Sequence, residues 1–420
     1  MLRSMYSGIS GLRTHQTMMD VVGNNIANVN TAGYKSSSTV FQDVLSQTLQ
    51  GAGAPVNGAG GTNPAQVGLG VKLGAISTNF AQGASQLTGR ATDLAIQGDG
   101  FFAVQQGGEN LYTRSGSFNF DANGSLVTPS GASVLGWKAN AGAINPNGPL
   151  EPVRLPIGQT LPPVQTGTVR LGGNIPDTEY DAAATDPVSI TNGVTIFDSQ
   201  GAPIKLSITY TQTGNDTWSV EATAPNANGS TPDAVVGTGT LTWDAATGKF
   251  NEPSMTLAAA GMAGVGNFTK DVTVQFGTPD EPMTQYAGSN SVAALEQDGA
   301  AIGALQSFTI SPNGTVMGIF SNGMQEAIAQ IAMANFANPG GLEKVGGSMY
   351  RPSPNSGLVQ TGVAGEGGRG TLSGGTVEMS NVDLAQEFTN LIVAQRGFQA
   401  NSRVISSSDE LLQDLVNLKR

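Results

Sequence analysis

The chain has 420 residues, enough for about three folded units at roughly 150 residues each, and its 58 glycines with only 12% charged residues indicate many turns and extended surfaces. Its 31 acidic and 19 basic residues give a net charge of −12, which would repel phosphate backbones and excludes nucleic acid as an expected partner. The absence of cysteine excludes disulfides and thiolate metal sites, so stability has to come from packing.

An apolar stripe with seven-residue spacing predicts a helix near the N-terminus. The stripe consists of Met5, Leu12, Met19 and Ile26, with Leu2 and Ile9 at its alternate positions. Asn24, Asn25 and Gly33 end the pattern. Polar residues interrupt this stretch too often for a secretory signal, and no run of about 18 apolar residues occurs in the chain, so neither a cleaved signal nor membrane insertion is expected.

The segment that follows predicts a short helix and then a connector. Phe41, Val44, Leu45 and Leu49 have helical spacing, and residues 51–63 are rich in glycine, alanine, asparagine and proline. Such a composition is typical of a flexible connector or a long hairpin.

Alternating apolar and polar residues predict antiparallel β structure over most of the remaining chain, beginning with residues 94–104 and 111–120. Asn-Gly pairs predict turns at Asn123, Asn192, Asn228, Asn313 and Asn322. Proline-rich residues 146–163 and the cluster at 288–291 bracket a second β unit, which we interpret as an insertion. The three tryptophans, Trp137, Trp218 and Trp243, are expected in β cores.

A second heptad stripe predicts a long C-terminal helix. It consists of Leu384, Leu391, Phe398, Ile405 and Leu412, with Phe388 and Val416 on the neighbouring row. Asn381 or Ser380 is the expected cap, and Asp383 lies where the helix dipole favours an anion.

Two arrangements of the terminal helices are compatible with these stripes. The helices could pack against each other inside one monomer, or they could be covered by other copies of the chain. Because the stripes lie at the extreme ends, remote from the β cores, the second arrangement is favoured, with ends that fray in the free chain. Coupled assembly and folding of the ends would follow.

Catalytic chemistry is poorly supported by the sequence. The single histidine, His15, is expected on the polar surface of the first helix. A Ser-His-Asp site would have to recruit it from that helix, and no cysteine nucleophile exists, so hydrolase chemistry of these types is not expected. No cofactor or metal site is expected. A pair of carboxylates remote in sequence stays possible, so a secreted β-rich enzyme or adhesin, with its helices paired within the monomer, is the alternative from a different class.

The two ends together resemble the rod and hook proteins of the bacterial flagellar axis. The N-terminal motif is carried by Asn24, Asn25, Asn28, Gly33 and Tyr34 within residues 7–12 and 24–35, and the C-terminal motif by Asn381 and Asp383 within residues 378–384 and 395–401. Residues 93–102, 112–116 and 330–339 are similar to the β domain shared by hook and distal rod proteins, and residues 195–201 to a hook outer-domain strand. A hook protein is therefore favoured over a distal rod protein.

The resemblance implies an α+β multidomain fold with coiled-coil-like terminal helices and mostly antiparallel β domains, the outer one inserted in the inner one. The expected parts are a helical domain (1–30 and 378–420), a connector (31–72 and 366–377), an inner β domain (73–149 and 286–365) and an outer β domain (150–285). It implies a non-enzymatic hook subunit that polymerises into a flexible curved tube and transmits torque. Its implied partners are further copies, the rod, the hook cap, the hook–filament junction proteins and the flagellar type III export apparatus.

Overall fold

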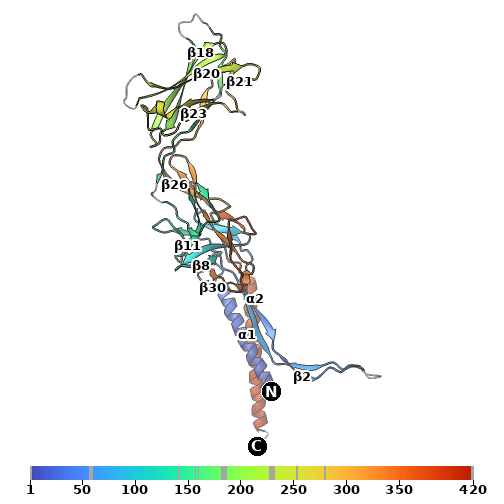
Figure 1. Ribbon diagram of the computed structural model, residues 1–420. Coiled ribbons are helices and arrows are strands. Elements are labelled where there is room, and N and C mark those ends of the chain that lie inside the picture. The colour runs from blue at the N-terminus through green and yellow to red at the C-terminus, as the bar shows by residue number, and fades with distance from the viewer. Residues whose placement is uncertain are drawn as a thin grey trace. The chain divides into compact units, whose positions relative to one another are not determined.

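The computed structural model describes residues 2–55, 60–140, 142–156, 158, 160–180, 187–226, 232–251, 254–278 and 281–417. The chain forms two compact units. The first contains Met1–Leu155, Phe308–Met317 and Glu326–Arg420, and the second contains Pro156–Ser307 and Gly318–Gln325. The second unit is thus an insertion in the sequence of the first, and mostly antiparallel β structure lies between two terminal helices, as the sequence predicts (Figure 1).

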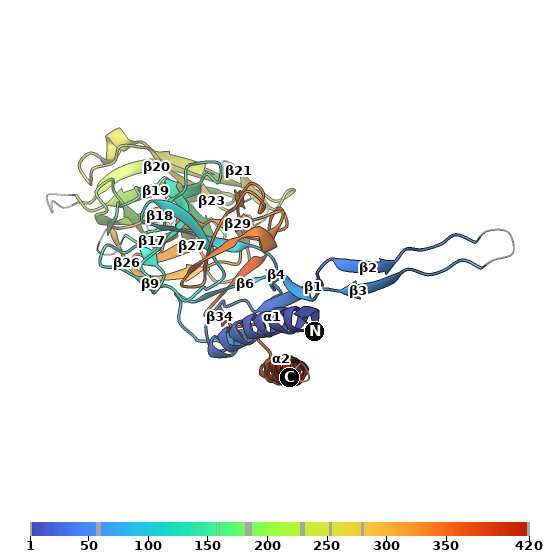
Figure 2. The ribbon, with the colours of Figure 1, turned by 90° about the horizontal axis from the view of Figure 1, so that it is seen from below.

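The two terminal helices of the first unit, α1 (Leu2–Ala27) and α2 (Leu384–Asn417), lie side by side (Figures 1 and 2). Helix α2 is capped by Asp383, whose carboxylate accepts hydrogen bonds from the amides of Ala385 (2.9 Å) and Gln386 (3.2 Å). The expected cap at Asn381 or Ser380 is therefore wrong, because Asn381 binds other backbone groups. Neither helix, over its described residues, combines the length and apolar character needed to cross a membrane.

A long antiparallel hairpin follows α1, so the short helix predicted around Phe41, Val44, Leu45 and Leu49 is wrong. Strands β1 (Ser37–Asp43) and β4 (Val71–Thr78) form its base, and β2 (Ser46–Gln50) pairs with β3 (Ala65–Gly68) further out. Figure 2 shows the β2–β3 end extending away from the helices. The alternating burial along β1, with Phe41 packed against His15, has the two-residue period of a strand rather than a helical period.

The β domain of the first unit is a sheet in the order β28-β11-β7-β8-β31-β30, around an aromatic core that includes Phe101, Tyr112 and Trp137. Two short antiparallel strand pairs, β6–β33 and β5–β34, connect the segment before this sheet in the sequence with the segment that precedes α2. The bounds are β5 Ser85–Leu87, β6 Leu94–Gln97, β7 Phe101–Gln106, β8 Glu109–Thr113, β9 Asn119–Phe120, β10 Leu126–Val127, β11 Ser133–Asn140, β12 Ala143–Ile144, β13 Glu151–Pro152, β28 Gln325–Ile331, β29 Met333–Asn335, η2 Pro339–Gly341, β30 Glu343–Gly346, β31 Met349–Arg351, β32 Gln360–Gly362, β33 Thr371–Gly374 and β34 Thr376–Glu378.

The second unit contains a five-stranded antiparallel sheet, β17-β18-β19-β20-β21, and a four-stranded sheet, β22-β23-β15-β25, which share one core around Trp218 and Tyr210. Strands β26 and β27 contain residues of both units. The bounds are β14 Thr160–Leu161, β15 Thr168–Gly172, β16 Asn174–Pro176, β17 Ser189–Phe197, β18 Pro203–Gly214, β19 Thr217–Ala224, β20 Ala234–Asp244, β21 Lys249–Asn251, β22 Ser254–Leu257, η1 Ala259–Met262, β23 Val272–Phe276, β24 Thr284–Tyr286, β25 Ala293–Gln297, β26 Gly303–Ile310 and β27 Thr315–Phe320.

The predicted core and turn residues have mixed outcomes. All three tryptophans are buried, which confirms their expected place in β cores. The Asn-Gly turns are confirmed at Asn123, Asn313 and Asn322, and Asn228 lies outside the described residues. The turn at Asn192 is wrong, because Asn192 and Gly193 pair with β18 in the middle of β17, where flanking threonine, isoleucine and valine favour a continuous strand.

Candidate assembly surface on the terminal helices

The seam between α1 and α2 is built mainly from small residues, with Ile405 as a contact from the predicted C-terminal stripe. A Cβ atom added to Gly8 would lie 3.2 Å from Cγ1 of Ile405, and one added to Gly11 would lie 2.7 Å from Oδ1 of Asn401. On the facing side of α2, Ala394 is fully buried. Small side chains let two helix backbones approach closely, so the helices are in tight contact while few large apolar groups are buried between them.

His15 belongs to this seam, so the expectation of a solvent-exposed histidine is wrong. Its ring is half-buried, packs edge-on against Phe41 at 5.8 Å, and occupies the space where Gly397 of α2 has no side chain. The physical reason is that Gly397 leaves a recess on α2 which a flat ring can fill. A heptad pattern contains no signal for such a recess.

The structure leaves the predicted stripe residues only partly covered. Half-buried positions are Met5, Leu12, Met19, Ile26, Leu391, Phe398, Ile405 and Leu412, whereas Ile9, Leu384 and Phe388 are exposed. The side chains of Leu2 and Val416 lie outside the described residues. One copy of the chain thus brings the two stripes near each other without burying them fully.

Four exposed apolar residues of α2 escaped the sequence analysis. Ile392 continues the row of Leu384 and Phe388 at four-residue spacing, and these three side chains are 58%, 41% and 50% exposed. Val393, Val404 and Leu411 form a second row on another side of the helix and are 54%, 43% and 55% exposed. The heptad that starts at Leu384 passes over both rows, although the i, i+4 spacing of the first and the seven-residue interval from Val404 to Leu411 could have been read from the sequence.

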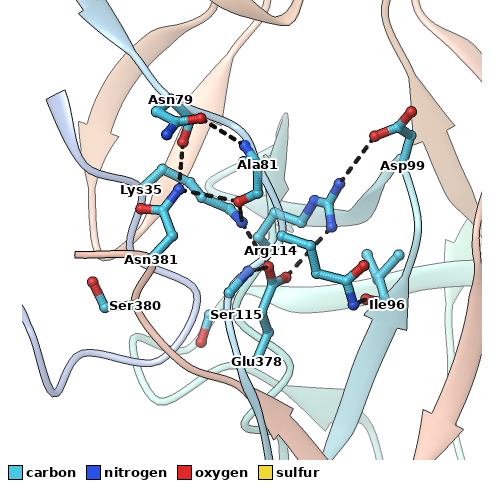
Figure 3. Close-up of polar contacts among 12 residues, drawn as sticks. Lys35, Asn79, Ala81, Ile96, Asp99, Arg114, Ser115, Glu378, Ser380 and Asn381 are labelled. Carbon is cyan, nitrogen blue, oxygen red and sulfur yellow. Dashed lines mark hydrogen bonds and ion pairs between the residues drawn. The ribbon is translucent and has the colours of Figure 1, made fainter. Parts of the chain in front are cut away.

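A buried ionic cluster attaches the helix pair to the β domain (Figure 3). Nζ of Lys35 lies 2.6 Å from Oε1 of Glu378 and donates a hydrogen bond of 2.8 Å to the carbonyl of Ala81. The other carboxylate oxygen of Glu378 lies 3.4 Å from the guanidinium of Arg114. All three side chains are at most 2% exposed. Burial lowers the pKa of Lys35, and its hydrogen bond to Glu378 opposes that effect.

The C-terminal motif residues complete this junction. Asn381 accepts a hydrogen bond from the amide of Ser36 (2.8 Å). It donates to the carbonyls of Asn79 (2.8 Å) and Ala81 (3.0 Å) (Figure 3). Asp383 caps α2 as described. These two residues therefore hold the start of α2 in place beside the segment that follows α1.

The N-terminal motif residues hold the turn after α1. Asn25 is fully buried and joins three segments, because it donates to the carbonyl of Ser37 (2.8 Å) and to Glu387 (3.2 Å) and accepts from the hydroxyl of Tyr34 (3.1 Å). Gly33 adopts φ 68° against the backbone of Ser115, where a side chain would collide. Asn28 donates a hydrogen bond of 2.9 Å to the carbonyl of Asn24.

Lys344 of β30 is a further contact that the sequence analysis missed. Its ammonium donates to the carbonyl of Lys35 (3.2 Å) and the hydroxyl of Ser37 (2.9 Å), and lies 5.1 Å from the ring centre of Tyr34. Burial lowers the pKa of Lys344 and raises that of Tyr34. Nothing in the local sequence around Lys344 signals contacts with a segment more than 300 positions away.

The described residues contain no group of three or more histidine, aspartate or glutamate side chains placed to hold a metal ion. The geometry is that of a mechanical junction: a helix pair with exposed apolar rows, tied to a β domain by a buried ionic cluster. The fold and this junction define a class of multidomain proteins in which a pair of terminal helices with exposed apolar rows is joined to β domains.

The sequence matches four family profiles over most of its length. They are described as flagella basal body rod protein (residues 5–35), flagellar hook protein FlgE/F/G D1 domain (95–171), flagellar basal body protein FlaE D2 domain (170–300) and flagellar basal body rod FlgEFG protein C-terminal (373–418). The chain belongs to the flagellar hook protein FlgE family and is a structural subunit of the flagellar hook.

Relatives match over their full length. The chain is 38% identical to the flagellar hook protein FlgE of Treponema pallidum, with 100% of both chains covered, and 34% identical to that of Escherichia coli, with 98% of both covered. It is also 33% identical to the flagellar basal-body rod protein FlgG of Bacillus subtilis, again over 100% of both. The crystal structure of Helicobacter pylori flagellar hook protein FlgE2 shares the fold, with a TM-score of 0.52 and 17% identity over 70% of this chain and 100% of that one.

Proposed function

We propose that the terminal helices are the surface through which copies of the chain polymerise into the hook. The proposed contact residues are those of the two predicted stripes, Leu2, Met5, Ile9, Leu12, Met19, Ile26, Leu384, Phe388, Leu391, Phe398, Ile405, Leu412 and Val416, together with Ile392, Val393, Val404 and Leu411. Burying a large apolar side chain contributes about 1.5–3 kcal/mol, so a few contacts per subunit offset the ordering of side chains and helix ends.

The observation that carries this proposal is the exposure of the row Leu384, Phe388 and Ile392 on a helix that is already paired. The pairing of α1 with α2 in a single copy means that these helices need not be unfolded before assembly. The row nevertheless stays uncovered, and a contiguous apolar surface on a helix is typical of a protein interface.

The tube built in this way would be an inner ring of helices that carries torque from rod to filament as a flexible, curved universal joint. Two features support this role. The helix pair is tied to its β domain by a buried ionic cluster, which resists separation under load. The second unit is an insertion with its own core and few charged residues, suited to weak contacts that can slide as the tube bends.

The four-part division into helical domain, connector, inner and outer β domain remains part of this proposal, as do the finer partners. These are the rod, the hook cap, the hook–filament junction proteins and the flagellar type III export apparatus, with export outside the cell and no cleaved signal. We further propose that the chain has no enzymatic activity, requires no cofactor, and binds neither nucleic acid nor the membrane interior.

A distal rod subunit is the second candidate, favoured by the full-length match to a rod protein. A strain that lacks this chain discriminates between the two functions. Cells with complete rods but no hooks support the hook subunit, whereas cells that lack the distal rod support the rod.

The assembly surface is tested by electron microscopy of the purified full-length protein and of Phe388→Asp. We expect concentration-dependent tubes from the natural sequence and none from the variant, with unchanged circular dichroism because Phe388 lies on the surface of one copy. Leu358→Asp, at an exposed apolar residue of a loop in the β domain, is the matched control and should still form tubes. Normal tubes from Phe388→Asp would refute the assignment, and a natural chain that stays monomeric at every concentration would count against polymerisation through these helices.

A further inference from the structure

We propose that the last turns of α2 in one copy bind a groove between α1 and β4 of a second copy. This inference rests on the assembly function proposed above and adds which two surfaces meet.

The groove is formed where the hairpin base comes close to α1. The amide of Val71 donates a hydrogen bond of 3.2 Å to the hydroxyl of Ser10, and this contact holds β4 beside the helix. The resulting groove has a volume of about 390 Å³, and Tyr6, Ile9 and Leu73 line it with exposed apolar surface. A cavity of about 150 Å³ is enough to hold benzene, so this groove has room for two aliphatic side chains.

The groove also carries positive charge without a partner. Arg13 and Lys72 line it and are exposed, and all ion pairs among the described residues are made by other side chains. A chain of net charge −12 has many acidic groups that could neutralise them. An apolar floor with cationic walls fits an apolar ridge that is flanked by carboxylates.

The end of α2 provides such a ridge. Val404 and Leu411 are seven residues apart on one side of the helix and both are exposed, with the small Ser407 between them. Glu410 and Asp414, one and three positions from Leu411, flank it and are exposed, and Arg403 is the only base in the described part of these turns. The ridge therefore matches the groove in both polarity and charge.

A single copy cannot join its own ridge to its own groove. Within one chain α2 faces α1 through Ile405, near Gly8, and successive residues of a helix are about 100° apart, which turns Val404 away from that seam. On α1, Arg13 is two positions from Gly11 and so lies on the opposite side from the seam. Because ridge and groove are different surfaces, their pairing is head-to-tail and leaves one of each free at every step, so an open helical polymer forms when the successive rotations do not close into a ring.

Cysteine cross-linking tests the pairing directly, since the natural chain has no cysteine. Equal amounts of Leu73→Cys and Leu411→Cys are polymerised together and oxidised mildly, and the linked peptides are identified by mass spectrometry. We expect the 73–411 disulfide in polymers at about tenfold or more the yield of a control mixture of Leu358→Cys with Leu411→Cys. Polymers without enrichment of this link overturn the pairing and leave the assembly function standing, whereas a natural chain that never polymerises overturns the assembly function itself.

A charge exchange tests the electrostatic part. Arg13→Glu and Asp414→Arg should each raise the critical concentration for polymerisation about tenfold, and the double variant should restore it, because every interface then pairs opposite charges again. Circular dichroism confirms that the monomers stay folded. A double variant that polymerises no better than either single variant contradicts the proposed contact.

Discussion

The ammonium of Lys35 lies 2.6 Å from the carboxylate of Glu378, and both side chains are fully buried although 343 positions separate them in the sequence. Lys35 follows α1, and Glu378 is the last residue of β34, shortly before α2 begins. The pair therefore fastens the inner ends of both helices to one point of the β domain. Any force transmitted between the helices and the β domain of this unit passes close to that point.

Replacement of Glu378 with glutamine should destabilise the first unit strongly. The variant keeps the size of the side chain but leaves the charge of Lys35 buried without a carboxylate, and leaves Arg114 with only the exposed Asp99 at 4.0 Å. Breaking a buried ion pair by removing one partner costs about 3–5 kcal/mol. Urea unfolding followed by circular dichroism measures the change.

Glu109→Gln is the control for that experiment. Glu109 and Arg351 form an ion pair of similar chemistry on the surface of the same unit, with both side chains nearly half exposed. Solvent screens such a pair, so no measurable change in the free energy of unfolding is expected. Equal losses in the two variants would show that burial is not what makes the Lys35–Glu378 pair important.

Glu387 should make the helix junction more stable in mild acid than at neutral pH. Burial raises the pKa of Glu387, against the hydrogen bonds from Asn25 and Asn390 that lower it. The folded state therefore binds a proton more tightly than the unfolded state, so this contribution is fully present below the unfolded pKa of about 4.3 and is lost as the pH rises through the folded pKa. Thermal melts between pH 4 and pH 7 should detect it.

Glu387→Gln should remove that part of the pH dependence and stabilise the junction at pH 7, because the amide has no charge to bury. Asp20→Asn serves as the control, since Asp20 is an exposed acid of α1. The interpretation fails if Glu387→Gln retains the slope of the natural protein.

The two helices could be predicted from the sequence because a heptad pattern of apolar residues is typical of a long amphipathic helix. Helices α1 and α2 occupy the expected segments. Their mode of contact could not be predicted. Gly8, Gly11 and Gly397 form the seam, and glycine carries no hydrophobic signal. The recess that Gly397 leaves also explains why His15 is half-buried.

The junction between the helix pair and the β domain can be predicted from the sequence only in part. A family resemblance singles out Asn25, Gly33, Tyr34 and Asn381 as motif residues, but Asn25 and Asn381 make hydrogen bonds to segments hundreds of positions away, which no local periodicity indicates. The spacing of Phe41, Val44, Leu45 and Leu49 predicts a helix only by coincidence, because the hairpin strands β1 and β2 occupy this segment. Pairing with β4, a tertiary contact, decides the conformation there.

Two glycine substitutions should separate close packing from helix propensity. Gly397→Ala introduces a Cβ atom into the ring of His15, whereas Gly23→Ala meets nothing within 4 Å. Both gain about 0.5–1 kcal/mol in helix propensity, and overpacking should cost Gly397→Ala about 1–3 kcal/mol in addition. Urea titrations should therefore show that Gly23→Ala raises the free energy of unfolding above that of the natural protein. The free energy of unfolding of Gly397→Ala should be lower than that of Gly23→Ala by the cost of overpacking. Equal stabilisation of both variants would mean that the helices are not in tight contact at His15.

The core of the second unit should respond to Gln285→Met without affecting the first unit. Gln285 is buried, accepts a hydrogen bond of 3.1 Å from the indole of Trp218, and donates one of 3.0 Å to the carbonyl of Asn215. Methionine preserves the volume but leaves the indole nitrogen of a fully buried tryptophan without an acceptor, which costs about 1–3 kcal/mol.

Scanning calorimetry should show this loss as a lower transition temperature of the second unit alone, by about 2–4 °C for each kcal/mol. Glu296→Gln, which removes a partly exposed ion pair with Arg170 in the same unit, should leave both transitions in place. Because each unit has its own core, tube formation through α1 and α2 should also persist in Gln285→Met. A joint shift of both transitions would show instead that the two units unfold as one. The second unit would then not be mechanically independent of the first, which would count against the proposed sliding of second units as the tube bends.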